Sequence, residues 1–126
     1  MTFQKVGLQE MLDSADPFIW LQGWYYALCN DDWEHGYGPN LTTLDNPGWH
    51  LKIELINTGL ADVEFEKIFV ERSEHDWLHC KKTPSHFDAH GGPVNLTEML
   101  AIFREWANPH LMIREYPNIY GTGDEQ

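Results

Sequence analysis

The apolar residues of the chain first follow a helical period after residue 16. Asp16 and Pro17 form a typical helix start, because Asp caps free backbone N–H groups and Pro fits the first helical position. The apolar residues that follow share one helical face: Leu21, Trp24, Tyr25 and Leu28. The pattern predicts a helix from residue 16 to a point between Cys29 and Asp31, with this face in a core.

A second and stronger helical stripe lies near the C-terminus. Its members recur at intervals of three and four residues: Leu96, Met99, Leu100, Phe103 and Trp106. Asn95 and Glu98 have the spacing of a capping box, in which each side chain binds a free backbone N–H. Asn108 and Pro109 stop the pattern, so we expect a closing helix between Asn95 and Asn108.

Between these helices the pattern changes to the alternation that is typical of strands. Residues 49–56 place apolar side chains at every second position, so one face of this strand belongs in the core. Residues 37–44 form its expected hairpin partner. The intervening Asp45-Asn46-Pro47-Gly48 predicts a type II turn, in which Pro47 presets φ and Gly48 adopts a positive φ.

Two further strands are expected at residues 62–72 and 77–82, and a short extended piece near His86 follows. The alternation in 62–72 slips at Lys67-Ile68, which indicates a bulge or a bend. Short connections favour an antiparallel meander with both helices on one face. The predicted fold class is α+β, a two-layer sandwich with an antiparallel sheet of about four to five strands, flanked by an N-terminal and a C-terminal helix.

A chain of 126 residues can bury one core, so we expect a single domain over residues 1–126. Residues 16–108 hold the core. Residues 1–15 are a lead-in, which is either a short helix packed on the domain or a mobile segment. Residues 109–126 form a tail whose last six residues are expected to fray. We expect neither a signal peptide nor a membrane span, which would need about 20 apolar residues.

Composition narrows the class of partner. The 20 acidic residues outnumber the 8 basic ones and give a net charge of −12. Such a charge repels nucleic acid and anionic membranes and suits a basic partner or a cationic ligand. The alternative is an acidic surface that only keeps the protein soluble. Two cysteines do not make a disulfide framework, so we expect reduced thiols and a cytoplasmic protein.

The segment that most suggests function connects the first helix to the hairpin. Asp31, Asp32 and Glu34 lie within four residues, His35 follows them, and Asp45 lies at the hairpin tip. Such carboxylates suit four uses: solvated loop acids, contacts to Arg or Lys of a partner, a hard-cation site, and acid–base catalysis. Trp33 lies among them, either as a plug beneath this corner, which we favour, or as an exposed anchor. The other tryptophans of the apolar stripes are expected in the core: Trp24, Trp49, Trp77 and Trp106.

Motifs for catalysis are missing from the sequence. No G-x-S-x-G, P-loop or dinucleotide fingerprint occurs, and Cys29 lies at the helix end whose dipole disfavours a thiolate. Four histidines and Cys80 lie within sixteen residues, which is enough for a zinc site: His75, His79, His86 and His90. Their spacing matches no zinc motif, so surface histidines and a buried thiol are the expectation.

Several of these segments together resemble a known family. They are WLQGWY at 20–25, NDDWEHGYG at 30–38, TLDNPGW at 43–49, and GGPVNL and FREW near the C-terminus. They look like the immunity protein 53 family, small antitoxins of bacterial polymorphic toxin systems, and the resemblance covers roughly residues 18–107. Asn30 stands where the pattern of that family has Asp or Gly.

The resemblance implies a protein that binds and neutralises a cognate toxin domain by stoichiometric association, without enzymatic turnover. We expect no cofactor and assign no metal ligands, and a metal at the acidic corner is left open. The acidic charge fits a basic nuclease-type toxin. The contact residues are expected to be Asp31, Asp32, Glu34 and Asp45, with Trp33 and His35 as second choices. The alternative is a small metal-dependent or acid–base enzyme that uses the same four carboxylates, and a third option is an interaction module without a toxin.

Overall fold

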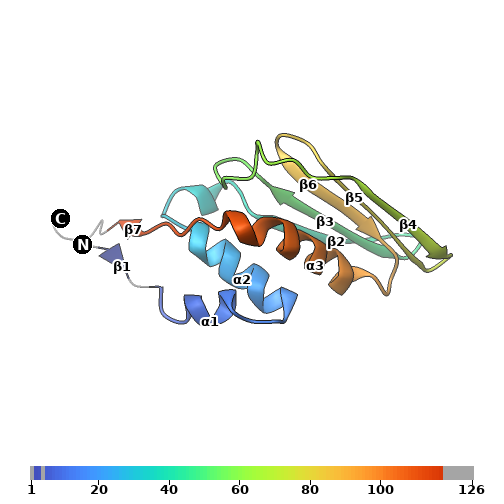
Figure 1. Cartoon of the computed structure of the whole chain (residues 1–126), viewed down its shortest axis with the longest axis horizontal. Coiled ribbons are helices and arrows are strands. Elements are labelled where there is room, and N and C mark those ends of the chain that lie inside the picture. The colour runs from blue at the N-terminus through green and yellow to red at the C-terminus, as the bar shows by residue number, and fades with distance from the viewer. Residues whose placement is uncertain (1, 4, 118–126) are drawn as a thin grey trace.

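Five antiparallel strands in one sheet, with helices over one face, make up the body of the protein (Figure 1). The structure is a computed structural model that describes residues 2–3 and 5–117. Helices α2 (Pro17–Leu28) and α3 (Leu96–Ala107) lie side by side beneath the sheet, and α1 (Leu8–Leu12) packs on α2. The predicted α+β class, with an antiparallel sheet and flanking helices, is confirmed.

The strands do not follow one another across the sheet in chain order. The order is β2–β3–β6–β5–β4, with bounds β2 (Pro39–Leu44), β3 (Gly48–Glu54), β4 (Ile68–Ser73), β5 (Asp76–Lys82) and β6 (His86–Gly91). β4, β5 and β6 form a meander, but β6 also pairs with β3. The expected simple meander is therefore wrong, because the chain crosses to the opposite edge of the sheet after β3 and returns to β3 with β6.

The strand predicted over residues 62–72 forms only in its second part, because residues 62–67 belong to the crossing segment. β4 begins only at Ile68, where the alternation slips, and residues 62–67 are not paired in the sheet. Phe65 packs edge-on against Phe87 and Trp106, with ring centroids 5.3 and 5.4 Å away. The alternation before Ile68 thus reflects packing against the core. The irregular pairing in β4 lies between Glu71 and Ser73 and not at the predicted position.

Gly48 is required for a different reason than the one predicted. It is the first residue of β3 and its φ is not positive, so the expected type II turn is wrong. A Cβ on Gly48 would lie 2.3 Å from the carbonyl oxygen of Gly91 on β6. Glycine is therefore needed here because a neighbouring strand passes too close for a side chain.

The two core helices begin in different ways. Asp16 caps α2 as predicted, and its carboxylate accepts the backbone N–H of Phe18 at 2.9 Å. Asn95 makes no such capping bond, so the expected capping box is wrong. Its side-chain oxygen accepts the backbone N–H of Trp77, and its amide donates to Asp76 and Glu98. Asn95 thereby ties the start of α3 to the start of β5.

Aromatic rings from both layers meet at Phe103 of α3. Its ring centroid lies 5.0 Å from that of Trp24 on α2 and 5.1 Å from that of Phe87 on β6. Trp20, on the same side of α2, packs edge-on at 6.0 Å. Such edge-on and tilted contacts are favourable arrangements of aromatic rings. Phe103 therefore joins both helices to the sheet.

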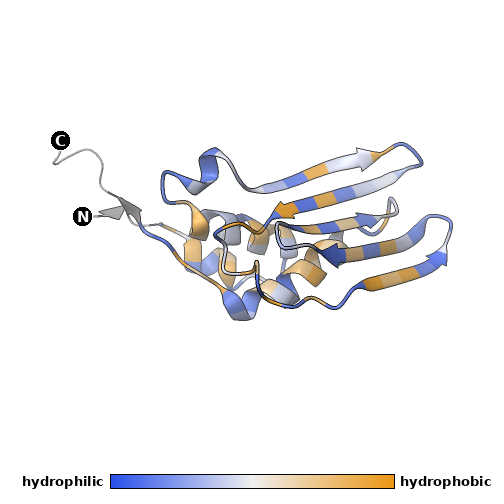
Figure 2. Ribbon diagram, turned by 90° about the horizontal axis from the view of Figure 1, so that it is seen from above, coloured by the Kyte–Doolittle hydropathy of each residue, from blue (hydrophilic) through white to orange (hydrophobic). Residues whose placement is uncertain are grey.

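The opposite face of the sheet carries no helix. Bands of hydrophobic and hydrophilic residues alternate along the strands in Figure 2, and the buried Leu78 and Cys80 point toward the helices. Trp77 alternates with them and lies on the open face, 5.0 Å from the ring of His79. Its predicted place in the core is wrong, whereas Trp24 is buried as predicted and Trp49 and Trp106 pack half-buried against the core.

The lead-in is packed on the domain through α1. Leu8 and Leu12 are buried, and a Cβ at Gly23 would lie 2.7 Å from the Cβ of Met11, so this glycine allows α1 and α2 to approach. Short strands β1 (Thr2–Phe3) and β7 (Tyr116–Pro117) pair with each other. The expected fraying of residues 121–126 lies outside the described residues. No described helix has the length and apolarity to cross a membrane.

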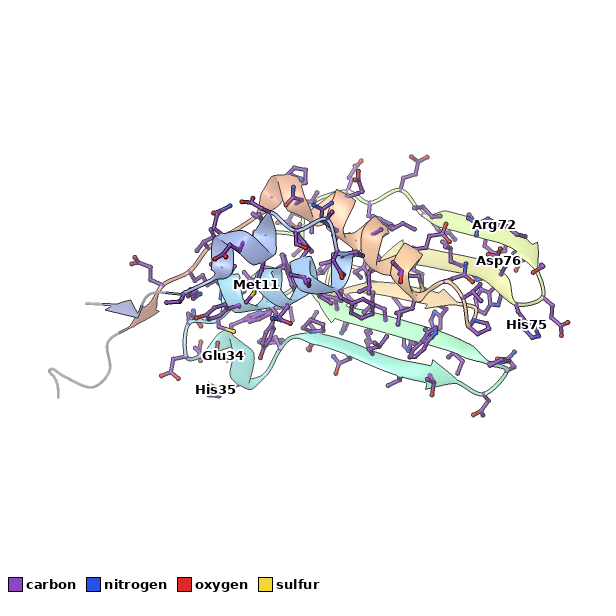
Figure 3. All side chains as sticks on the ribbon, turned by 90° about the horizontal axis from the view of Figure 1, so that it is seen from below. Met11, Glu34, His35, Arg72, His75 and Asp76 are labelled. Carbon is purple, nitrogen blue, oxygen red and sulfur yellow. The ribbon has the colours of Figure 1, made fainter. Side chains whose placement is uncertain are left out.

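A charged cluster fastens the β4–β5 hairpin to α3. The guanidinium of Arg72 donates to Asp76 and to Glu98, each at 2.7 Å, and Figure 3 shows Arg72 and Asp76 together at the hairpin end of the molecule. Hydrogen bonds from Asn95 and Arg72 lower the pKa of Asp76, and Arg72 is the main cause of the lowered pKa of Glu98.

Arg72→Gln is expected to change how stability depends on pH. A carboxylate with a lowered pKa in the folded state stabilises the fold above its ordinary pKa of about 4, and this contribution is lost as pH falls through the folded pKa. The variant should therefore be less stable than the native protein at pH 7, and the difference should shrink below about pH 4. Urea unfolding at pH 7, 4 and 3 measures it, and a constant difference would contradict the expectation.

Gly48→Ala is expected to destabilise the protein by about 1–3 kcal/mol, because the new methyl must displace the backbone of Gly91. Gly36→Ala is the matched control. Gly36 has a φ of −130°, and a Cβ there meets nothing within 4 Å, so its effect should stay within about 0.5 kcal/mol. Urea unfolding compares both variants with the native chain, and equal stability of all three would overturn the explanation.

Candidate functional site

The connection between α2 and β2 is closed by its own side chains. One carboxylate oxygen of Glu34 accepts the backbone N–H of Asn30 at 2.9 Å, and the other accepts that of Asp31 at 2.7 Å. The side-chain oxygen of Asn30 accepts the backbone N–H groups of Asp32 and Trp33. We call residues 30–35 the acidic corner. Glu34 has a structural role in it that the sequence did not reveal.

Trp33 is the plug of the acidic corner. It begins the short 3₁₀ helix η1 (Trp33–His35) and its side chain is only 3% exposed. The indole N–H donates to the carbonyl of Ile56 at 2.9 Å, and the ring packs against Trp24 and Tyr25. The side chain is thus too enclosed to serve as a surface anchor, in agreement with the favoured of the two interpretations.

The outer side of the acidic corner consists of Asp31, Asp32 and His35. Asp31 has a positive φ of 70°, and its carboxylate lies 3.5 Å from Nε2 of His35. Asp32 and His35 are exposed. Asp45 is not part of this cluster, because it follows β2 at the end remote from η1, about 20 Å along the strand. Figure 3 shows Glu34 and His35 at the end of the molecule opposite to Arg72 and His75.

A groove of about 540 Å³ adjoins the acidic corner, between α2 and residues 34–40. Phe18 and Tyr25 of α2 line it, and their side chains are 44% and 36% exposed. Glu34, His35 and Glu54 add polar groups to the lining. Sequence reasoning missed this groove and assigned Tyr25 to the core face. Phe18 lies three residues before Leu21 and seven before Tyr25, so the sequence places all three on one helical face and does not reveal that they line a groove.

Two groups of described side chains have the geometry to hold a metal ion. One is Asp31, Glu34 and His35 in the acidic corner, and the other is His50, Asp88 and His90 on the open face of the sheet. Both carboxylate oxygens of Glu34 already accept backbone N–H groups, so the first group has less free ligand capacity. The second group brings together residues about forty positions apart in the chain. The spacing of residues within one strand could not have predicted it.

The histidines singled out by their spacing are not assembled into one site. Alternation puts His79, His86 and His90 on the open face and Cys80 on the core face, while His75 lies in the β4–β5 turn. Burial and the nearby charge of His50 lower the pKa of His90. The expectation of surface histidines and a buried thiol agrees with this arrangement.

Both cysteines are free and buried. Burial raises the pKa of the Cys80 thiol to about 12. Burial also raises the pKa of Cys29, and the negative charge of Glu34 adds to the effect. Since a thiolate is the reactive form of cysteine, the two side chains are held in their unreactive form near neutral pH.

Glu34→Ala is expected to lower the free energy of unfolding by about 2 kcal/mol, because two backbone N–H groups lose a charged acceptor. Asp32→Ala, two residues away and exposed, serves as the control and should change it by no more than about 0.5 kcal/mol. Urea unfolding measures both. If the two substitutions changed the free energy of unfolding equally, Glu34 would not have the structural role assigned to it.

Comparison with known proteins gives one result. No curated protein and no solved structure matches the chain significantly. The family model of immunity protein 53 matches residues 18–108, which include α2 except its first residue, the acidic corner, the whole five-stranded sheet and α3. The match covers more than half of the chain, and it agrees with the resemblance seen in the sequence. This protein therefore belongs to the immunity protein 53 family.

Proposed function

We propose that this protein binds a cognate toxin domain of a bacterial polymorphic toxin system and neutralises it by stoichiometric association, without enzymatic turnover. Family membership is the observation that carries the proposal, since an immunity family implies a toxin as partner. The net charge of −12 supports a basic partner, for which a nuclease domain is the proposed type, because opposite charges accelerate association. The proposed location is the cytoplasm.

The proposed docking surface is the outer side of the acidic corner together with the adjoining groove. Asp31, Asp32 and His35 offer polar and charged contacts at its rim, and Phe18 and Tyr25 offer exposed aromatic area. Interfaces commonly combine a few aromatic anchors with a polar, charged rim. This combination supports the acidic corner over the isolated acids elsewhere on the surface.

The other proposed contact residues have more limited roles. Glu34 contributes negative charge to the surface and holds the loop that presents Asp31 and Asp32. Trp33 supports the loop from beneath. A standard interface covers about 800 Å² per partner, a patch roughly 30 Å across, so Asp45 belongs to it only if the toxin also covers β2.

The alternative of a metal-dependent or acid–base enzyme fits this geometry less well. It needs the carboxylates of Asp31, Asp32, Glu34 and Asp45 to act on one substrate. Asp45 lies at the other end of β2, and the carboxylate oxygens of Glu34 accept backbone N–H groups. The arrangement therefore favours a binding surface.

The double variant Asp31→Asn and Asp32→Lys tests the docking surface. Asn tolerates the positive φ at residue 31, and the two changes remove the local negative charge. The proposed toxin is the C-terminal domain of a large secreted protein encoded beside this chain. The association rate constant with this domain should fall about tenfold or more at low salt, and less at high salt. Biolayer interferometry measures the rate, and rescue of growth on co-expression gives the cellular readout.

Glu74→Lys is the matched control, because Glu74 is an exposed acid in the β4–β5 turn at the opposite end of the molecule. It should leave the association rate nearly unchanged. Circular dichroism checks that both proteins are folded.

If the double variant binds as tightly as the native protein, the docking surface lies elsewhere. The edge strand β4, with its exposed Phe69 and Glu71, is then the next candidate. If the native protein does not bind the toxin domain, the proposal that the toxin is its partner is wrong.

A further inference from the structure

Three histidines stand side by side on the open face of the sheet. The register pairs His50 of β3 with His90 of β6, and His90 with His79 of β5. Side chains of directly paired residues share one face of a sheet. That face is the open one, because the adjacent residues Leu51 of β3 and Ala89 of β6 are buried against the helices. Figure 2 views the molecule from this side, with the strands in front of the helices.

Asp88 lies on the same face as His90, two residues before it on β6. Its carboxylate oxygen is 2.6 Å from Nε2 of His50. The rings of His50 and His90 are stacked, with centroids 4.0 Å apart and planes 9° from parallel. One ligand atom from each of the three side chains lies within 4.8 Å of the other two.

We propose that His50, Asp88 and His90 form a binding site for a divalent transition-metal ion, for which Zn²⁺ is the probe. Zinc binds imidazole nitrogen and carboxylate oxygen at about 2.0–2.2 Å, so its ligand atoms lie about 3–4 Å from one another. An imidazole nitrogen binds a metal in the plane of its ring, so the stacked rings of His50 and His90 must tilt toward each other to reach this arrangement. Two imidazoles and one carboxylate are a donor set that suits zinc, and they leave a fourth position for water.

The position of these residues favours a defined site. β3 and β6 are inner strands of the sheet, so each is paired on both sides and the backbone positions of the ligands are held in place. The side chains of His50 and Asp88 are 27% and 22% exposed, which shields an ion in part and leaves it accessible. The acidic corner is less suited to a metal ion, because its ligands lie in the connection that contains the short helix η1 and Glu34 already accepts two backbone N–H groups.

Two lysines on the same face oppose a cation at this site. Lys52 of β3 and Lys81 of β5 are the direct cross-strand neighbours of Asp88. Their positive charges repel a divalent ion and attract the carboxylate that would bind it. Removing one of these charges should therefore strengthen zinc binding, whereas removing a ligand should weaken it.

Zinc titration of the untagged full-length protein tests the site. Isothermal titration calorimetry should show one Zn²⁺ per chain. His90→Gln and Asp88→Asn should each lower the affinity about tenfold or more, because each removes one metal ligand. Lys81→Met should raise it. The ring-proton NMR signals of His50 and His90 should shift on addition of zinc, which identifies the residues directly.

His86→Gln is the matched control, because His86 lies on the same strand and face, two residues before Asp88, and is outside the proposed ligand set. It should bind zinc as the native protein does. Far-UV circular dichroism establishes that each variant is folded. The proposal fails if the native protein binds no zinc, if His90→Gln binds it equally well, or if His86→Gln weakens binding as much as His90→Gln. None of these results depends on the toxin, so the proposed function is tested separately.

Discussion

The packing of Phe103 between the two layers is the contact on which the other features depend. Its ring touches Trp24 of α2 and Phe87 of β6, so one side chain of α3 holds both helices on the sheet. Burying a side chain of this size contributes roughly 1.5–3 kcal/mol, a large part of the stability of a small domain. Trp24 in turn packs against Trp33, which anchors the acidic corner. The surface acids are thus positioned by a continuous row of aromatic rings that begins in the core.

The acidic corner divides its polar groups between holding the loop and facing outward. Glu34 and Asn30 satisfy four backbone N–H groups of the loop, and Asp31, Asp32 and His35 remain on its outer side. A loop fixed in this way presents its charges without having to be ordered by a partner, which lowers the entropic cost of association. This favours a preformed docking surface, as proposed for the toxin-binding role.

Local patterning predicted the elements that depend on nearby residues. The helical stripes identified α2 and α3, and the Asp16 N-cap formed as expected because its bond spans only two residues. The hairpin at residues 39–54 was also foreseen, as were the acidic corner and the plug role of Trp33. The pattern of apolar residues gave wrong predictions where an apolar side chain is not part of a strand face or helix face that packs on the core. Residues 62–67 alternate because Phe65 packs on Trp106, and Trp77 is half-buried on the face that carries no helix.

Tertiary structure alone decided that β6 lies between β3 and β5. The insertion of β6 between β3 and β5 sets the close approach that requires Gly48, and it places His50 beside His90 from forty residues away. The period of a sequence reports which face of one element is buried, because burial repeats with the geometry of that element. It carries no information on strand order or register, since these depend on the summed contacts of the whole core. The helices, the hairpin and the acidic surface can therefore be read along the chain, whereas the groove and the histidine cluster exist only after folding.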